Sequence, residues 1–261
     1  MSDPSESSFP VVQGIAPIPA RIARPVLAIG NFDGVHRGHR AVINAALAMA
    51  QTLGRPAAAL TFEPHPRSFF QPDANLFRLT PGQQKLDCLA RTGLAGAIVL
   101  PFDAALARVT AEDFVEEILV RRFGVSGVVV GFDFHFGRAR AGSPAFLREA
   151  GARLGFPVEV VEPALDEGDP ISSSAIRNAL AAGQVGHAAH MLGRPWSVRA
   201  TVIHGDKRGR DLGYGRELDV AFHGYLRPEL KFDDIDALIA QMNKDSAAAR
   251  LVLARPQVWP V

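Results

Sequence analysis

Short apolar runs alternate with longer amphipathic stretches along the first two thirds of the chain. The runs are rich in Val, Ile, Leu and Ala, which is typical of strands buried on both faces of a sheet. We predict strands at Val26–Ile29, Ala57–Phe62, Ala97–Leu100, Val128–Val130 and Val158–Val161. Between and after them, apolar residues recur at helical spacing, and we predict helices at Arg40–Leu53, Gly82–Arg91, Ala111–Phe123, Pro144–Leu154 and Ser173–Ala182.

This alternation predicts an α/β fold. Strand–helix–strand units form right-handed crossovers, so the strands line up as a parallel sheet with helices on both faces. We therefore expect a Rossmann-like, doubly wound sheet, whose ligands bind at the carboxyl ends of the strands. Residues 1–22 precede it as a lead-in rich in Ser and Pro, where Val11 and Val12 can add an edge strand.

The pattern changes near Gly183–Pro195. We predict two short strands and an amphipathic helix beyond it, at Val198–His204, Leu218–Phe222 and Asp234–Leu253. The helix carries an apolar stripe at Ile235, Leu238, Ile239 and Met242. One or two strands and a helix cannot form an independent barrel or sheet. We therefore expect one domain over residues 23–185 and an incomplete segment over residues 186–261.

Composition narrows the functional classes. There are 28 Lys and Arg against 27 Asp and Glu, so the net charge of +1 creates no field that would recruit nucleic acid. The single cysteine, Cys88, excludes a disulfide framework, fits a reducing compartment and is expected to be a small buried apolar group. No apolar run approaches the length of a membrane span, and the first ten residues lack the basic start of a signal peptide. We expect a cytoplasmic protein without nucleic-acid or membrane partners.

The most informative segment is Gly30–His39, which follows a predicted strand and leads into a predicted helix. A strand that turns through glycines onto a helix N-terminus presents backbone N–H groups and the helix dipole to one spot, which binds anions. His36 and His39, beside that spot, can hold phosphate oxygens. Two surface histidines at a helix start are the alternative, and the glycine-rich context favours the phosphate site.

This segment resembles a known family. Its sequence is Gly-Asn-Phe-Asp-Gly-Val-His-Arg-Gly-His, and His-x-Gly-His is the signature of a nucleotidyltransferase superfamily. The ten-residue string is similar to that of the FMN adenylyltransferase (FAD synthetase) domain of bacterial bifunctional riboflavin kinase/FAD synthetases. The resemblance implies catalysis by His36 and His39 and ATP binding by Gly30, Asn31, Phe32, Asp33 and Gly38.

A second motif supports the same resemblance. Thr61–Pro66 reads Thr-Phe-Glu-Pro-His-Pro, where the family has Thr-Phe-(Asp/Glu)-Pro-His-Pro in a loop that lies against the flavin. In isolation, this hexapeptide would be interpreted as a Pro-rich turn with a surface histidine. Beside the first motif, the resemblance implies a flavin site made by Glu63, Pro64, His65 and Pro66.

A third motif, Gly131–Gly137, is similar to the family pattern Gly-x-(Asp/Asn)-Phe-x-Phe-Gly. The resemblance implies that Asp133 accepts hydrogen bonds from the ribose or base of ATP, while Phe134 and Phe136 pack beneath the loop. Arg138 and Arg140 are flanking anion candidates.

A fourth motif, Ile171–Arg177, resembles the superfamily's Ile-Ser-Ser-Thr-x-Ile-Arg, with Ser in place of the common Thr. Serines at a helix N-terminus and a nearby arginine bind phosphates through hydroxyl, backbone N–H and guanidinium groups. For a single serine, an ordinary N-cap is the alternative. The resemblance implies ATP binding by Ser172, Ser173 and Ser174 and a catalytic role for Arg177 at the β- and γ-phosphates.

Together the motifs indicate an enzyme of FAD biosynthesis that transfers AMP from ATP to FMN. No covalent enzyme intermediate is needed, so catalysis rests on positioning and electrostatic stabilisation of the transferring group. His36 and His39 would hold the α-phosphate, and Ser173 and Arg177 the departing pyrophosphate. Mg²⁺ is expected with the ATP phosphates and without a dedicated protein metal site. His187 and His190 are expected to be surface or packing residues.

The resemblance breaks near the C-terminus. Gly205–Tyr214 is similar to the start of the family's riboflavin kinase barrel, which continues with Pro-Thr-Ala-Asn. Here Gly215-Arg216-Glu217-Leu218 follows instead, and with Leu226–Phe232 it resembles a much later part of that barrel. We therefore expect a truncated remnant of a β-barrel kinase domain that ends in a helix and has lost kinase activity, because a barrel needs closure. Its orphaned apolar surfaces must pack on the transferase domain or on another subunit, and the second choice would give a homo-oligomer formed through the remnant. The sequence does not decide between them.

Three alternatives stay open at this point. A non-catalytic FMN- or nucleotide-binding module could keep the motifs without the chemistry. A transferase of the same superfamily could act on phosphopantetheine or nicotinamide mononucleotide. The chain could also be an edited version of a fully bifunctional riboflavin kinase/FAD synthetase.

Overall fold

The computed structural model describes residues 9–74, 76–203 and 214–254. The chain divides into two compact units, Met1–Ile171 and Ser172–Val261. The first contains the predicted sheet and the second the helices and strands that follow it. The predicted functional boundary near residue 185 stays a prediction.

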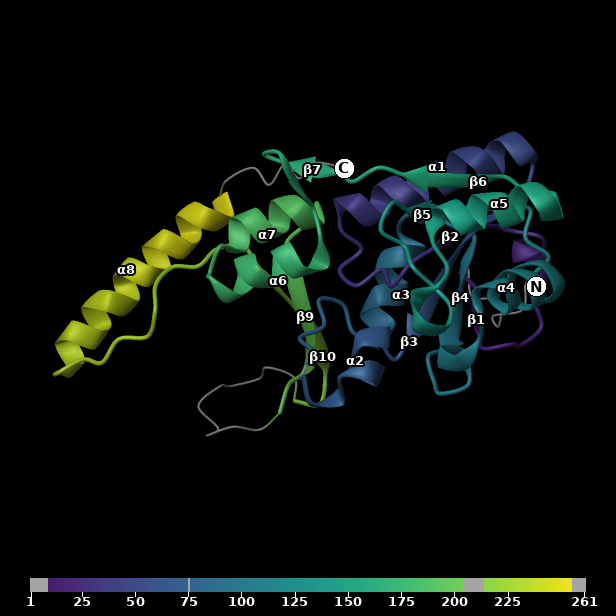
Figure 1. Cartoon of the computed structure of the whole chain (residues 1–261). Coiled ribbons are helices and arrows are strands. Elements are labelled where there is room, and N and C mark those ends of the chain that lie inside the picture. Colours follow the sequence, from purple (N-terminus) through teal and green to yellow (C-terminus); the bar gives the residue numbers. More distant parts are fainter. Residues whose placement is uncertain (1–8, 75, 204–213, 255–261) are drawn as a thin grey trace, which may run out of the picture. The chain divides into compact units, whose positions relative to one another are not determined.

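A six-stranded parallel sheet forms the centre of the first unit, in the order β1-β4-β3-β2-β5-β6 (Figure 1). Its strands are β1 (Val11–Gln13), β2 (Val26–Ile29), β3 (Ala57–Glu63), β4 (Gly96–Pro101), β5 (Gly127–Gly131) and β6 (Val158–Val161). All five predicted strands are confirmed, and Val11 and Val12 do form an edge strand. From β2 the chain builds outward to β4 and then returns to the other side of β2 with β5. The carboxyl ends of β2 and β5 therefore meet at a topological switch point, where ligands of such sheets bind.

Helices cover both faces of this sheet, as the doubly wound prediction requires. The helical segments of this unit are η1 (Ala20–Ile22), α1 (Arg37–Leu53), α2 (Pro66–Phe70), η2 (Pro72–Ala74), α3 (Gly82–Ala90), η3 (Leu106–Arg108), α4 (Ala111–Asp113), its π-helical continuation η4 (Phe114–Arg122), η5 (Arg138–Arg140) and α5 (Pro144–Leu154). Side chains of β2 alternate between the two cores. Val26 and Ala28 pack in the cluster that contains α1 and α3, and Leu27 and Ile29 pack in the cluster that contains α4, η4 and α5.

Several short elements, among them a helix and a hairpin, were absent from the sequence prediction. Helix α2 begins directly after His65, and the hairpin of β7 (Leu165–Asp166) and β8 (Asp169–Pro170) turns at Glu167 and Gly168, both with positive φ. Helix α1 begins at Arg37 rather than at Arg40, because His36 serves as its N-cap. Cys88 is half-buried and packs at the edge of the apolar core, as a small apolar group does.

The second unit holds α6 (Ser173–Ala181), α7 (Val185–Leu192), β9 (Trp196–Thr201), β10 (Glu217–Phe222) and α8 (Ile235–Ala254). β9 and β10 pair antiparallel, with Trp196 opposite Phe222. The predicted strand Val198–His204 therefore starts earlier, and His204 lies outside the described residues. The described part of this unit is a two-stranded ribbon with helices, which is a truncated remnant rather than a closed barrel. No helix among the described residues is long and apolar enough to cross a membrane.

Candidate active site

The loop between β2 and α1 is backbone-strained. Phe32, Gly34 and Val35 have φ values of 51°, 91° and 42°, in the left-handed region that non-glycine residues rarely adopt. Phe32 and Val35 are also fully buried. Such strain persists only where the surrounding structure fixes the backbone, and it is commonest at functional sites.

Asp33 holds this loop in place. Its carboxylate is buried and accepts hydrogen bonds from the backbone N–H groups of Leu79 (3.2 Å) and Thr80 (3.0 Å). In return, the N–H of Gly34 donates to the Thr80 hydroxyl at 2.8 Å. The structure thus gives Asp33 a role in loop geometry, and its predicted contact with ATP stays a prediction.

His36 and His39 lie together at the N-terminus of α1. The His39 N–H donates to Nδ1 of His36 at 3.3 Å, and the two rings stack with centroids 3.6 Å apart and an interplanar angle of 21°. The Phe32 ring contacts the His39 ring edge-on, with the ring centroids 5.3 Å apart. A Cβ at Gly38 would lie 3.1 Å from the His36 ring, so glycine leaves room for this packing. The two predicted catalytic histidines therefore form one preorganised pair at the switch point.

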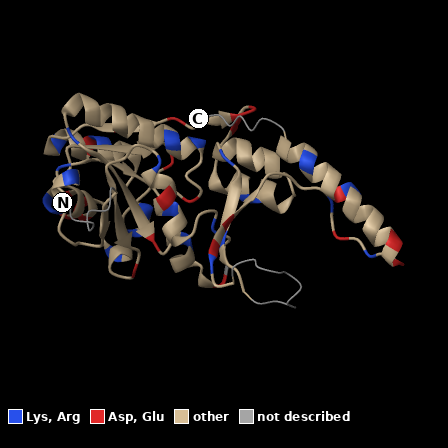
Figure 2. Cartoon of the chain, turned by 180° about the vertical axis from the view of Figure 1, so that it is seen from behind, with Lys and Arg blue, Asp and Glu red and all other residues tan. Residues whose placement is uncertain are grey.

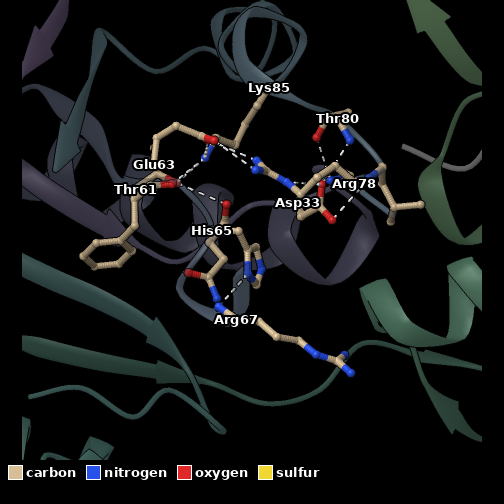
Figure 3. A network of polar contacts seen from close by, with 12 residues as sticks. Asp33, Thr61, Glu63, His65, Arg67, Arg78, Thr80 and Lys85 are labelled. Carbon is tan, nitrogen blue, oxygen red and sulfur yellow. Dashed lines mark hydrogen bonds and ion pairs between the residues drawn. The ribbon is translucent and has the colours of Figure 1, made fainter. Parts of the chain in front are cut away.

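A network of buried charge lies beside this loop (Figure 3). Arg78 binds both oxygens of the Glu63 carboxylate, at 2.9 and 3.0 Å, and its Nε lies 3.8 Å from the Asp33 carboxylate. The ammonium of Lys85, on α3, lies 3.3 Å from Glu63 and donates to the Thr61 hydroxyl at 3.1 Å. Glu63 thus holds two cations and helps to position the loop, and its predicted contact with flavin stays a prediction.

The same network reaches the backbone of the strained loop. The Thr61 hydroxyl donates to the carbonyl oxygen of Asn31 at 3.1 Å, and Lys85 also donates to the carbonyl oxygen of Phe62 at 3.0 Å. The ends of β2 and β3 and the segment before α3 are thereby joined through polar contacts. Asn31 presents its backbone to this network, which adds a structural role to its predicted ATP contact.

Burial and charge shift the ionisation of this network. Burial lowers the pKa of Lys85, against the raising effect of the Glu63 carboxylate. Burial alone would raise the pKa of Glu63, but the Arg78 hydrogen bond and the charges of Lys85 and Arg78 bring that pKa below its ordinary value of 4.5. The pKa of Arg78 is raised, because the hydrogen bond and charge of Glu63 outweigh its burial.

Sequence reasoning missed Arg78, Thr80 and Lys85. Lys85 had a detectable signal, because it stands four residues before Leu89 and therefore on the buried face of a predicted helix. A lysine on such a face requires acceptors. Arg78 and Thr80 lie in a connecting segment, where no periodic pattern marks them.

The Thr61–Pro66 motif runs from the last residues of β3 into the first residue of α2. His65 is half-buried and caps this helix, since its Nδ1 accepts a hydrogen bond from the Arg67 N–H at 3.1 Å. Pro66 is the first helical residue and Pro64 is exposed. The imidazole is therefore fixed in orientation, which agrees with a surface offered to a flat ligand.

The Gly131–Gly137 loop follows β5. Asp133 is exposed, and its carbonyl oxygen lies 2.9 Å from Nδ1 of His135. Phe134 and Phe136 stack at 5.4 Å and pack on the core, so the prediction that they lie beneath the loop is confirmed. Arg138 and Arg140 are exposed, and their predicted role as anion ligands stays a prediction.

The serine–arginine motif opens the second unit. Ser172 is the N-cap of α6, and its hydroxyl accepts a hydrogen bond from the Ala175 N–H at 3.1 Å. Ser173, Ser174 and Arg177 lie in the first turns of this helix. The ordinary capping role is thus real for Ser172, while the phosphate contacts of all four residues stay predictions.

No group of three His, Cys, Asp or Glu in the described ranges could hold a metal ion. His187 and His190 are exposed on α7. Mg²⁺ that keeps its waters and binds through substrate phosphates needs few protein ligands, so the residues present are compatible with it.

Two family models match the chain. One described as FAD synthetase matches residues 19–175, which is more than half of the chain, and one described as riboflavin kinase matches only residues 213–253. A bifunctional riboflavin kinase/FMN adenylyltransferase of Pseudomonas fluorescens is 33% identical over 290 residues, covering 88% of this chain and 93% of the relative. Because this alignment is longer than the chain's 261 residues, the relative has residues that this chain lacks.

A protein of the same description from Escherichia coli is 38% identical over 189 residues, covering 72% of this chain and 60% of the relative. The chain thus spans less than two thirds of that relative's length. Among solved structures, a macrolide-efflux protein from Streptococcus pneumoniae matches with a TM-score of 0.81 at 22% identity, over 93% of this chain and 99% of that one. At this identity the likeness is one of fold alone.

We expect Glu63→Gln to make the free energy of unfolding less dependent on pH in the acid range. A carboxylate with a lowered pKa stabilises the folded state above its unfolded pKa, near 4.5, and loses that contribution as the pH falls through its folded value. Urea unfolding from neutral to acid pH should therefore show the two proteins converging below about pH 4.5.

The matched control is Glu117→Gln, which removes the exposed helix pair with Arg121 and should change little at any pH. A constant difference between the parent protein and Glu63→Gln across the whole range would contradict the assigned role of Glu63.

Proposed function

We propose that this chain, which belongs to the FAD synthetase family, is an FMN adenylyltransferase that makes FAD and pyrophosphate from FMN and ATP. The observation that carries the proposal is the stacked pair of His36 and His39 at the N-terminus of α1, where the chain order of the sheet reverses. A helix N-terminus and two imidazoles suit the phosphates of a nucleotide.

The reaction needs no covalent enzyme intermediate. An oxygen of the FMN phosphate attacks the α-phosphorus of ATP, the bond from that phosphorus to the bridging oxygen breaks, and its electron pair leaves with pyrophosphate. We assign His36 and His39 to the oxygens of the α-phosphate, where charge develops, and Ser173 and Arg177 to the pyrophosphate. Charge stabilisation by prepositioned donors supplies the rate enhancement. Mg²⁺ would enter with the ATP phosphates and neutralise part of their charge.

The remaining site residues divide by role. Gly30, Asn31, Phe32, Asp33 and Gly38 shape the phosphate loop, and Asp133, Ser172 and Ser174 are assigned to ATP. Pro64, His65 and Pro66 form the flavin side. The fixed His65 ring supports FMN over phosphopantetheine or a nicotinamide nucleotide, because an imidazole face suits a flat aromatic ligand.

We further propose that riboflavin kinase activity is absent. The kinase model matches only residues 213–253, and the described strands of the second unit form one antiparallel pair. A pair of strands leaves unpaired edges and encloses no barrel. The single cysteine supports a cytoplasmic location, and copies of the chain are inferred to associate through residues 186–261.

A chromatographic assay tests the proposal directly. Purified protein receives ATP and Mg²⁺ with FMN in one tube and riboflavin in another. FAD from FMN, without FMN from riboflavin, is the expected result. FMN from riboflavin would contradict the loss of the kinase, and no product in either tube would favour a non-catalytic binding module.

His39→Ala should lower turnover roughly 100-fold or more, as loss of one transition-state donor does. The thermal midpoint should change little, because the ring is half-buried and alanine keeps the backbone N–H that donates to His36. His190→Ala, an exposed histidine of α7, is the control. An unchanged turnover would remove His39 from the mechanism.

His65→Ala should weaken FMN binding more than ATP binding, measured by titration calorimetry with each ligand. Because His65 also caps α2, His65→Asn is the matched variant, since asparagine keeps a capping acceptor and removes the ring. Both variants should lose FMN affinity. If asparagine restores it, the ring acts only through the cap and the flavin assignment is wrong.

A further inference from the structure

Helix α8 carries a regular exposed seam. Ile235, Ile239, Met242, Ser246, Ala249 and Leu253 follow one another at spacings that alternate between four and three residues. This is the a/d pattern of helices that pair along their length. Ile235, Ile239, Met242 and Leu253 are 71%, 50%, 58% and 62% exposed, so the described part of the chain leaves the large side chains of the seam mostly uncovered.

A different face of α8 contacts the segment that precedes the helix. Asp245 forms an ion pair with Arg227 at 2.7 Å and accepts a hydrogen bond from Gln241 at 2.8 Å. A Cβ at Gly224 would lie 3.1 Å from Val252. Gln241, Asp245 and Val252 share one side of the helix, which is rotated away from the seam. These contacts fix the helix to the segment that precedes it and leave the seam on another face. Most of its ribbon is uncharged (Figure 2).

We propose that this seam pairs antiparallel with the same seam of a second copy of the chain. Antiparallel pairing about the middle of α8 sets Ile239 against Ala249 of the second copy and Met242 against Ser246 of the second copy. Large side chains then meet small ones, which fills the interface at close helix spacing. A parallel pair would set Ser246 and Ala249 against themselves and leave gaps there.

Charge favours the same arrangement. Asp236 lies in the first turn of α8 and Arg250 in its last turns, and both flank the seam on the same side. In an antiparallel pair, each Asp236 lies near Arg250 of the second copy, at both ends of the interface. Opposite charges beside a helix seam select the partner and its orientation.

The inference specifies the association proposed for residues 186–261 and is independent of the adenylyl transfer. Failure of either can be recognised separately, because one is measured by mass and the other by FAD formation.

The test is the mass of the full chain, measured by light scattering or sedimentation over a range of concentrations. The expected result is a dimer for the parent protein. Ile239→Glu with Met242→Glu should weaken the dimer roughly 100-fold or more, since both place a charge in the apolar seam. Circular dichroism should show that helix content is kept.

The matched control is Leu251→Glu. Leu251 is 67% exposed on the same helix but outside the seam, so this variant should remain a dimer. Asp236→Arg and Arg250→Asp should each weaken the dimer, and the two together should restore it.

A parent protein that is a monomer at every concentration would overturn the proposal and favour packing of the seam on the first unit. A dimer that survives the seam substitutions, or that Leu251→Glu disrupts equally, would place the interface elsewhere. If the variant that carries both Asp236→Arg and Arg250→Asp does not recover the dimer, the antiparallel arrangement is wrong.

Discussion

The ion pair between Arg78 and Glu63 connects the parts of the candidate site that lie in the first unit. Arg78 bridges Glu63 at the end of β3 and Asp33 in the strained loop, and Lys85 completes the charge balance from α3. A partly buried pair of this kind adds little net stability but is costly to break, because each remaining charge would lose its nearest partner. Its effect here is geometric, since it holds the end of β3 and the strained loop after β2 in one arrangement.

The four central strands of the sheet were predictable because strands buried on both faces are continuous apolar runs. The first residues of the helices were less predictable. His36 and His65 both cap helices through an imidazole nitrogen, and histidine is not a residue whose presence marks a helix start. As a result α1 was predicted too short and α2 was missed.

The candidate site was only partly predictable for a related reason. Motifs placed His36, His39 and Asp133 after β2 and β5, and the strand order brings those ends together. No sequence pattern shows which carboxylate pairs with a cation that lies far away in the sequence. The partners of Asp33 and Glu63 could therefore be identified only from the structure. A residue of a sequence motif can therefore stabilise the loop on which it lies, whether or not it also binds the ligand.

Phe32 and Val35 hold left-handed backbone conformations without being glycine. Each such residue costs about 1–2 kcal/mol relative to ordinary backbone, so the loop between β2 and α1 lowers the stability of the fold locally. Glycine at either position would relieve this strain but would remove a buried side chain that packs the loop against the core, which costs more than the strain. The sequence of this loop is therefore expected to change slowly under thermal selection, even where nearby surface positions drift freely.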